Sequence, residues 1–124
     1  MKRDWKIIRK VLELIESENL KKYLEEELYV PELQTTDDVF LGHIEILIDA
    51  GIVRNAEVRR TAGGTFSFCS VNGVFISMEG HDLLDALRDT TVWSRIVAKA
   101  KHVGVSISWE FIKAAIPVVM KELL

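Results

Sequence analysis

One order of elements limits the fold of this chain more than any other feature of its sequence. An amphipathic helix is predicted over residues 37–51, with Gly51 as its left-handed C-cap, and a segment rich in β-formers follows. Asn72-Gly73 favours a two-residue hairpin turn because both residues tolerate a positive φ. A second helical pattern covers residues 79–88. Helix, hairpin and helix in this order predict a winged helix-turn-helix.

Helical periodicity also flanks this segment on both sides. Apolar residues recur at helical spacing over residues 4–17, and residues 18–36 are expected to form a short helix and an extended linker. Two further helices are predicted after residue 89, and the first of them is expected to end at Gly104. Ser, Thr and Asp are preferred N-caps, and the predicted caps of the helices after the linker are Thr36 or Asp37, Ser77, Thr90 or Thr91, and Ser108.

The β-rich segment between residues 52 and 78 is predicted to be an antiparallel meander of up to three strands. Closure at the two-residue turn sets Val71 opposite Val74 and Cys69 opposite Ile76. The predicted fold class is α+β and mainly α: a winged helix-turn-helix-like domain with this small meander and two additional C-terminal helices. We expect a core over residues 1–89 and a helical extension over residues 90–124 packed on it, within one structural domain.

Composition excludes several classes of protein. The hydrophobic fraction is 48%, yet no apolar run approaches the roughly 18–20 residues that span a bilayer. The N-terminal residues lead directly into a helical pattern without a secretory leader, so we expect a cytoplasmic protein with no membrane partner. The single cysteine excludes an internal disulfide and a multi-cysteine zinc site, and a formal net charge of −3 excludes overall attraction to phosphate.

The predicted recognition helix presents an acidic face. On an ideal helix at about 100° per residue, the side opposite Ile44 contains no lysine or arginine, and its acids repel the DNA phosphates. Three interpretations stay open: a solvated face, a protein-contacting face on which Gly42 permits close approach, and base reading in the major groove. The candidate protein-contact residues are Asp38, Val39, Gly42, His43, Glu45, Ile46 and Asp49.

Positive charge gathers at the N-terminus and in the first strand and turn of the predicted wing. If these two places are neighbours in the fold, they form a patch that contacts phosphates without the recognition helix. The alternative is that the charges only keep amphipathic elements solvated. The candidate DNA contacts are Lys2, Arg3, Lys6, Arg54, Arg59 and Arg60.

No residue pattern indicates catalysis, a metal site or a cofactor. His43, His81 and His102 lack the spacing of metal ligands. Cys69 ends a Phe-Ser-Phe-Cys pattern and has no evident base or helix N-terminus to lower the pKa of its thiol, so it is interpreted as a packing residue. The chain is therefore predicted not to be an enzyme.

The last two predicted helices are strongly apolar. Trp93 and Trp109 lie at helical spacing with isoleucines and are interpreted as core residues. Many winged-helix proteins place a dimerisation element after the wing, and we expect a homodimer. The candidate interface is Trp109, Ile112, Ile116, Met120 and Leu123.

Three runs of residues resemble a known family. They are the Met-Lys-Arg-Asp-Trp run of residues 1–5, residues 43–53, and residues 79–89 with Val92-Trp93 after them. In these runs the chain resembles the bacterial and prophage proteins catalogued as domain of unknown function 2513. The resemblance implies a winged-helix-like fold and association with mobile elements, and it implies no activity or catalytic residue. Two interpretations of the Glu-Gly-His-Asp run that opens residues 79–89 stay open. The first is helix capping, because acids near a helix N-terminus interact favourably with its dipole, and the second is a binding role for His81 with Asp82 and Asp85.

These features predict a non-catalytic protein that binds a macromolecule. The first hypothesis is a transcriptional regulator that binds duplex DNA. The predicted fold favours this hypothesis, and the charge of the recognition helix disfavours it. As an alternative it is a protein-interaction module, for example a phage-encoded inhibitor of a host protein, that binds through the acidic and apolar face of residues 37–51.

Overall fold

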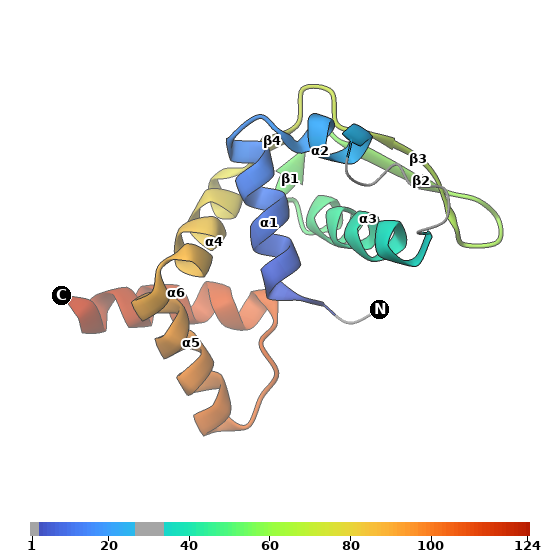
Figure 1. The fold of residues 1–124 in the computed structure, drawn as a ribbon. Coiled ribbons are helices and arrows are strands. Elements are labelled where there is room, and N and C mark those ends of the chain that lie inside the picture. Colours follow the sequence, from blue (N-terminus) through green and yellow to red (C-terminus); the bar gives the residue numbers. More distant parts are fainter. Residues whose placement is uncertain (1–2, 27–33) are drawn as a thin grey trace. The chain divides into compact units, whose positions relative to one another are not determined.

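The computed structural model describes residues 3–26 and 34–124. Over these residues the chain is mainly helical α+β, with six helices and two antiparallel two-stranded sheets (Figure 1). The contacts divide it into two compact units, Met1–His81 and Asp82–Leu124. Among the described residues, no helix is long and apolar enough to cross a membrane.

Three helices open the first unit: α1 (Trp5–Glu16), α2 (Leu20–Glu26) and α3 (Gln34–Asp49). Asp4 caps α1, because its carboxylate accepts a hydrogen bond of 2.9 Å from the Lys6 backbone N–H. α3 begins at Gln34, so the predicted cap at Thr36 or Asp37 is wrong. Gly51 has a φ of 74° and follows the end of α3, as its left-handed C-cap role predicted.

Four short strands form two nested pairs rather than the predicted three-stranded meander. β1 (Val53–Arg54) pairs with β4 (Phe75–Ile76), and β2 (Glu57–Arg60) pairs with β3 (Phe66–Ser70). Cys69 therefore lies opposite Val58, and Ile76 lies opposite Val53, so the predicted pairing of Cys69 with Ile76 is wrong. The β2–β3 pair lies between β1 and β4 in the sequence, so the four strands form one long antiparallel arm with β1–β4 at its base and β2–β3 nearer its tip.

Two irregular segments interrupt this arm and explain the register. Asn55 has a left-handed φ of 62°, and its side-chain amide donates a hydrogen bond of 2.9 Å to the Gly73 carbonyl. The turn at Asn72-Gly73 forms, because the Val74 N–H donates to the Val71 carbonyl at 3.1 Å. Strand pairing does not begin directly at this turn. At this point the Gly73 carbonyl accepts its hydrogen bond from the Asn55 side chain and not from a strand backbone. Sequence spacing alone placed the turn but not the break opposite it.

The start of α4 (Met78–Arg88) packs closely on the β1–β4 pair. Ser77 donates its backbone N–H to the Ile52 carbonyl at 2.9 Å, and its hydroxyl accepts from the Gly80 N–H at 3.1 Å, as expected of the predicted cap. A Cβ on Gly80 would meet the Ile76 side chain and would lie 2.7 Å from the Ile52 carbonyl oxygen. Glycine is therefore required at position 80 by close packing.

In the second unit, α5 (Thr90–Val103) packs against α6 (Trp109–Leu123). Asp89 caps α5 by accepting from two backbone N–H groups, so the predicted cap at Thr90 or Thr91 is wrong. Gly104 ends α5 with a φ of 75° and Ser108 caps α6, both as predicted. The buried apolar residues of the two helices are Val92, Ile96, Ala100, Ile112, Ala115 and Val119.

Candidate macromolecule-binding surfaces

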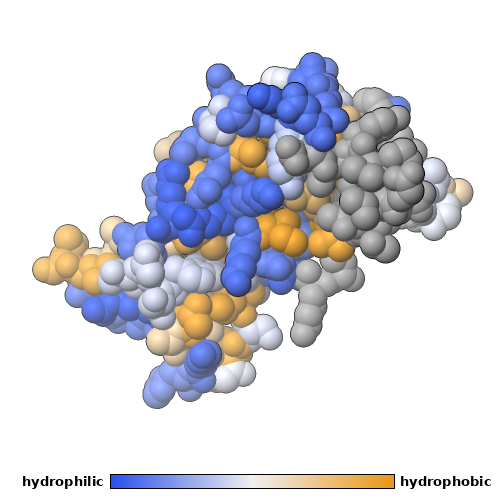
Figure 2. Space-filling view, in the orientation of Figure 1, coloured by the Kyte–Doolittle hydropathy of each residue, from blue (hydrophilic) through white to orange (hydrophobic). Residues whose placement is uncertain are grey.

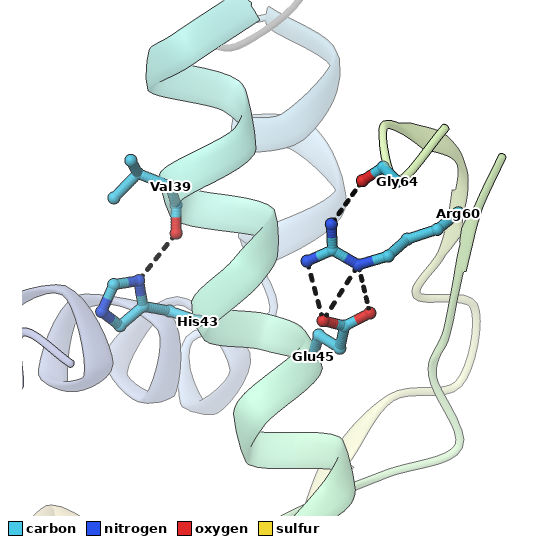
Figure 3. Close-up of polar contacts among 5 residues, drawn as sticks. All are labelled: Val39, His43, Glu45, Arg60 and Gly64. Atoms are coloured by element: carbon cyan, nitrogen blue, oxygen red, sulfur yellow. Dashed lines mark hydrogen bonds and ion pairs between the residues drawn. The ribbon is translucent and has the colours of Figure 1, made fainter. Parts of the chain in front are cut away.

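The β2–β3 hairpin is tied to the middle of α3 by Arg60. Its guanidinium donates to both carboxylate oxygens of Glu45, at 3.0 Å from Nε and 2.9 Å from Nη2, and also to the Gly64 carbonyl (Figure 3). The same guanidinium lies 3.9 Å from the centroid of the Phe66 ring. A bidentate, charge-assisted pair of this kind fixes orientation as well as distance. The hairpin therefore covers the Glu45 side of α3.

His43 is a core residue and not part of an exposed face. Its side chain is fully buried, and its Nε2 accepts from the Asp4 backbone N–H at 2.8 Å. Its Nδ1 lies 2.7 Å from the Val39 carbonyl (Figure 3). These partners require a neutral ring that carries its proton on Nδ1, because a carbonyl only accepts and an amide N–H only donates. His43 thus joins α3 to the residue that caps α1.

The remaining residues of the predicted protein-contact face do not form one continuous surface. Val39 and Asp49 are exposed, Ile46 is half-buried, and Gly42 is buried. Asp38 lies in α3, but its side chain is outside the described part of the structure. The expectation of a single exposed face is wrong because α3 packs on α1 and also on the hairpin. An ideal helical wheel could not include the second contact.

Two of the three arginines of the predicted wing are paired with acids. Arg60 binds Glu45, and Arg59 binds Glu57 at 2.7 Å. The hydrogen bond between Arg59 and Glu57, reinforced by their charges, lowers the pKa of the Glu57 carboxyl and raises the pKa of the Arg59 guanidinium. Arg54 is exposed and lies opposite Phe75 across the β1–β4 pair.

The cations predicted at the N-terminus are exposed where the structure describes them. Lys6 is exposed on α1, and the Arg3 guanidinium lies 5.4 Å from the centroid of the Trp5 ring. Lys2 lies outside the described residues. α1 and the hairpin both pack on α3, so the two basic segments share a neighbour. This shared packing does not by itself bring their cations into one patch.

The predicted dimer stripe on α6 is divided between core and surface. Ile112 is fully buried, so its assignment to an interface is wrong, whereas Met120 and Leu123 are exposed. Trp109 and Ile116 are half-buried, and the Lys113 ammonium lies 5.5 Å from the Trp109 ring centroid. The reason is that α6 turns the Ile112, Ala115 and Val119 side of the helix inward, which is rotated from the predicted stripe.

The second unit has two hollows beside its exposed apolar residues. One of about 520 Å³ lies between α5 and α6 and is lined mainly by apolar side chains, including Val103, Phe111 and Val118. The other, of about 330 Å³, combines three aspartates with apolar residues of α4, α5 and α6. Figure 2 shows hydrophobic surface on α5 and at the C-terminal end of α6. Sequence periodicity found these helices but not their hollows.

The single cysteine of the chain, Cys69, is free and half-buried in β3. Burial raises the pKa of the Cys69 thiol, which lowers its thiolate fraction at neutral pH. No group of three or more His, Cys, Asp or Glu residues within the described ranges is arranged to hold a metal ion. Sequence reasoning missed two polar contacts, Glu45 with Arg60 and His43 with Asp4, because each joins elements distant in the sequence.

Comparison with known proteins gives a family match and a distant relative. Residues 2–106 match the family described as hypothetical protein (DUF2513), which confirms the resemblance seen in the sequence. A protein of Haemophilus influenzae (strain ATCC 51907 / DSM 11121 / KW20 / Rd), described as an uncharacterized protein, is 25% identical over 132 residues, covering 100% of this chain and 99% of the relative. No solved structure matches the chain.

Proposed function

This chain belongs to the DUF2513 family, and we propose that it is a non-catalytic, cytoplasmic protein that binds a protein partner through a winged-helix-like N-terminal unit. The order α1, α2, α3 and hairpin supports this fold. The observation that carries the choice of a protein partner is the Glu45–Arg60 pair. It holds the hairpin on α3 and neutralises an arginine that a DNA-binding wing uses for phosphate contacts.

The exposed parts of α3 define where such a partner binds. Val39, in the N-terminal half of α3, is 39% exposed, and Asp49 at the C-terminal end of the helix is exposed, while Ile46 between them is half-buried. Apolar side chains next to a carboxylate suit a protein surface better than a duplex, whose phosphates repel the acid. The proposed contact is therefore smaller than the seven-residue face and consists of Val39, Ile46 and Asp49.

Site-specific photo-crosslinking tests this proposal. A photoreactive phenylalanine analogue replaces Val39 in the full chain, and the matched control carries it at exposed Lys22 of α2. We expect a discrete covalent adduct with one host protein from position 39 only, which Asp49→Arg reduces. Equal adducts from both positions, or none from position 39, would contradict a contact surface on α3.

Duplex DNA is the second candidate, supported by exposed Arg54 beside the half-exposed ring of Phe75 and by exposed Lys6. A mobility-shift assay across a salt series distinguishes the two candidates. Phosphate binding weakens steeply between about 50 and 200 mM salt. If DNA is the partner, Arg54→Glu abolishes the shift and Arg59→Glu, at a residue already paired with Glu57, weakens it less. Absence of a shift at low salt rejects DNA.

A further inference from the structure

An acid-rimmed apolar groove lies at one end of the second unit. Its volume is about 330 Å³. The lining residues with polar side chains are three aspartates, and the apolar lining residues include Met120, which is 48% exposed. We call the following set the acidic groove: Asp82, Asp85, Ala86, Asp89, Val92, Ile116 and Met120. Such a groove is complementary to a segment that carries cations next to apolar side chains.

The same unit carries a segment of that chemistry at the opposite end of α5. Lys101 and His102 are exposed in the last turn of the helix, and Val103 and Val105 are 64% and 49% exposed. Gly104, between the two valines, has a left-handed backbone conformation with a φ of 75°, and the chain turns there. We call these four residues around Gly104 the α5 tip. Exposed apolar residues that lie together and are rimmed by polar ones, here including Lys101, are typical of a contact surface.

We propose that the chain forms a two-fold homodimer in which the α5 tip of each protomer occupies the acidic groove of the other. One patch that contains both a protrusion and its complementary hollow satisfies a two-fold interface, because each contact is made twice. The arrangement sets the two α5 helices antiparallel, with each basic C-terminal end beside the acidic N-terminal end of its partner. Their helix dipoles then attract at both ends.

The groove cannot be filled by the tip of its own chain. Val92 lines the groove and Val103 begins the exposed apolar part of the tip, and both belong to the continuous helix α5. Eleven residues of helix at 1.5 Å each separate them by roughly 16 Å. A second copy is therefore the occupant that the chain itself supplies. This inference concerns the second unit and is independent of the partner proposed for α3.

Sedimentation velocity over a concentration series, on the full chain, tests the dimer through a charge exchange. Asp82 is the residue of choice, because Asp89 caps α5 and Asp85 binds Arg88. We expect Asp82→Lys and Lys101→Glu each to weaken the dimer about tenfold or more, since each sets like charges together. The variant with both changes restores the opposite charges and recovers most of the affinity.

Control variants separate this pairing from a change in net charge. Glu26→Lys and Lys6→Glu alter the charge by the same amounts at exposed positions of the first unit, and we expect them to leave the dimer unchanged. A chain that remains monomeric at every concentration overturns the proposal. So does a dimer that neither single change weakens, or a double variant as weak as the single ones.

Discussion

Gly80 is the residue at which packing and helix propensity make opposite predictions. It lies in the first turn of α4, and replacing glycine by alanine in a helix ordinarily stabilises a protein by about 1 kcal/mol. A Cβ here would meet the Ile76 side chain and the backbone carbonyl of Ile52. The Ile52 carbonyl also accepts the hydrogen bond from the Ser77 N–H, so it cannot move away without breaking that bond. We therefore expect Gly80→Ala to destabilise the fold by about 1–3 kcal/mol.

Urea unfolding followed by circular dichroism measures this loss. The matched control is Gly63→Ala, where a Cβ would lie 3.8 Å from the nearest atom, the Thr61 hydroxyl oxygen. We expect the control to change the free energy of unfolding by less than about 0.5 kcal/mol. A gain in stability for Gly80→Ala would show that α4 does not pack on β1 and β4 as described.

Cys69 is expected to react slowly as long as the chain is folded. Burial disfavours the charged thiolate and raises the pKa of the thiol above its ordinary value of about 8.5. At any pH below that raised pKa, the folded chain therefore holds a smaller fraction of thiolate than the unfolded chain. Iodoacetamide labelling against pH should therefore show a higher midpoint in buffer than in urea. Equal midpoints would mean that Cys69 is solvated.

Among the elements, the hairpin formed by β2 and β3 is joined to α3 by an ion pair as well as by packing. Glu45 and Arg60 are 30% and 42% exposed in their side chains, so we expect Glu45→Gln to cost only about 1 kcal/mol or less of stability. The larger effect is local, because this pair holds β2 and β3 against α3. Hydrogen exchange of residues 57–70 should become faster in the variant.

Glu57→Gln is the matched control for this loosening. It also removes one carboxylate from an arginine pair, but Glu57 and Arg59 belong to the same strand. Breaking a pair within one strand does not release the hairpin from α3. We expect its exchange pattern to equal that of the unchanged chain, and similar acceleration in both variants would contradict the role given to Glu45.

For the whole molecule, dimer formation makes thermal stability depend on concentration. A ligand that binds only the folded state raises Tm, and a second copy acts as such a ligand. For a chain of 124 residues, Tm should rise by about 2–4 °C for each tenfold increase in protein concentration. Scanning calorimetry of the unchanged chain and of Asp82→Lys checks this. The variant should lose most of the dependence over the same range.

Local sequence signals predicted most helix positions. The stripe that buries Ile8, Leu12 and Ile15 was visible from spacing, and so were the stops at Gly51 and Gly104. Caps were less certain, since Asp89 and not Thr90 or Thr91 caps α5. Neighbouring residues can all cap a helix, and only the observed hydrogen bonds distinguish them.

The sequence by itself determined the family, the helices, the hairpin turn and the acidic character of α3. The tertiary structure decided which faces stay exposed: it buried His43 and Ile112 and paired Arg60 with Glu45. The physical reason is the distance along the chain over which each interaction acts. Periodicity, capping and charge act within a few residues, whereas a helix with two packing partners is covered by contacts that join residues far apart in the chain.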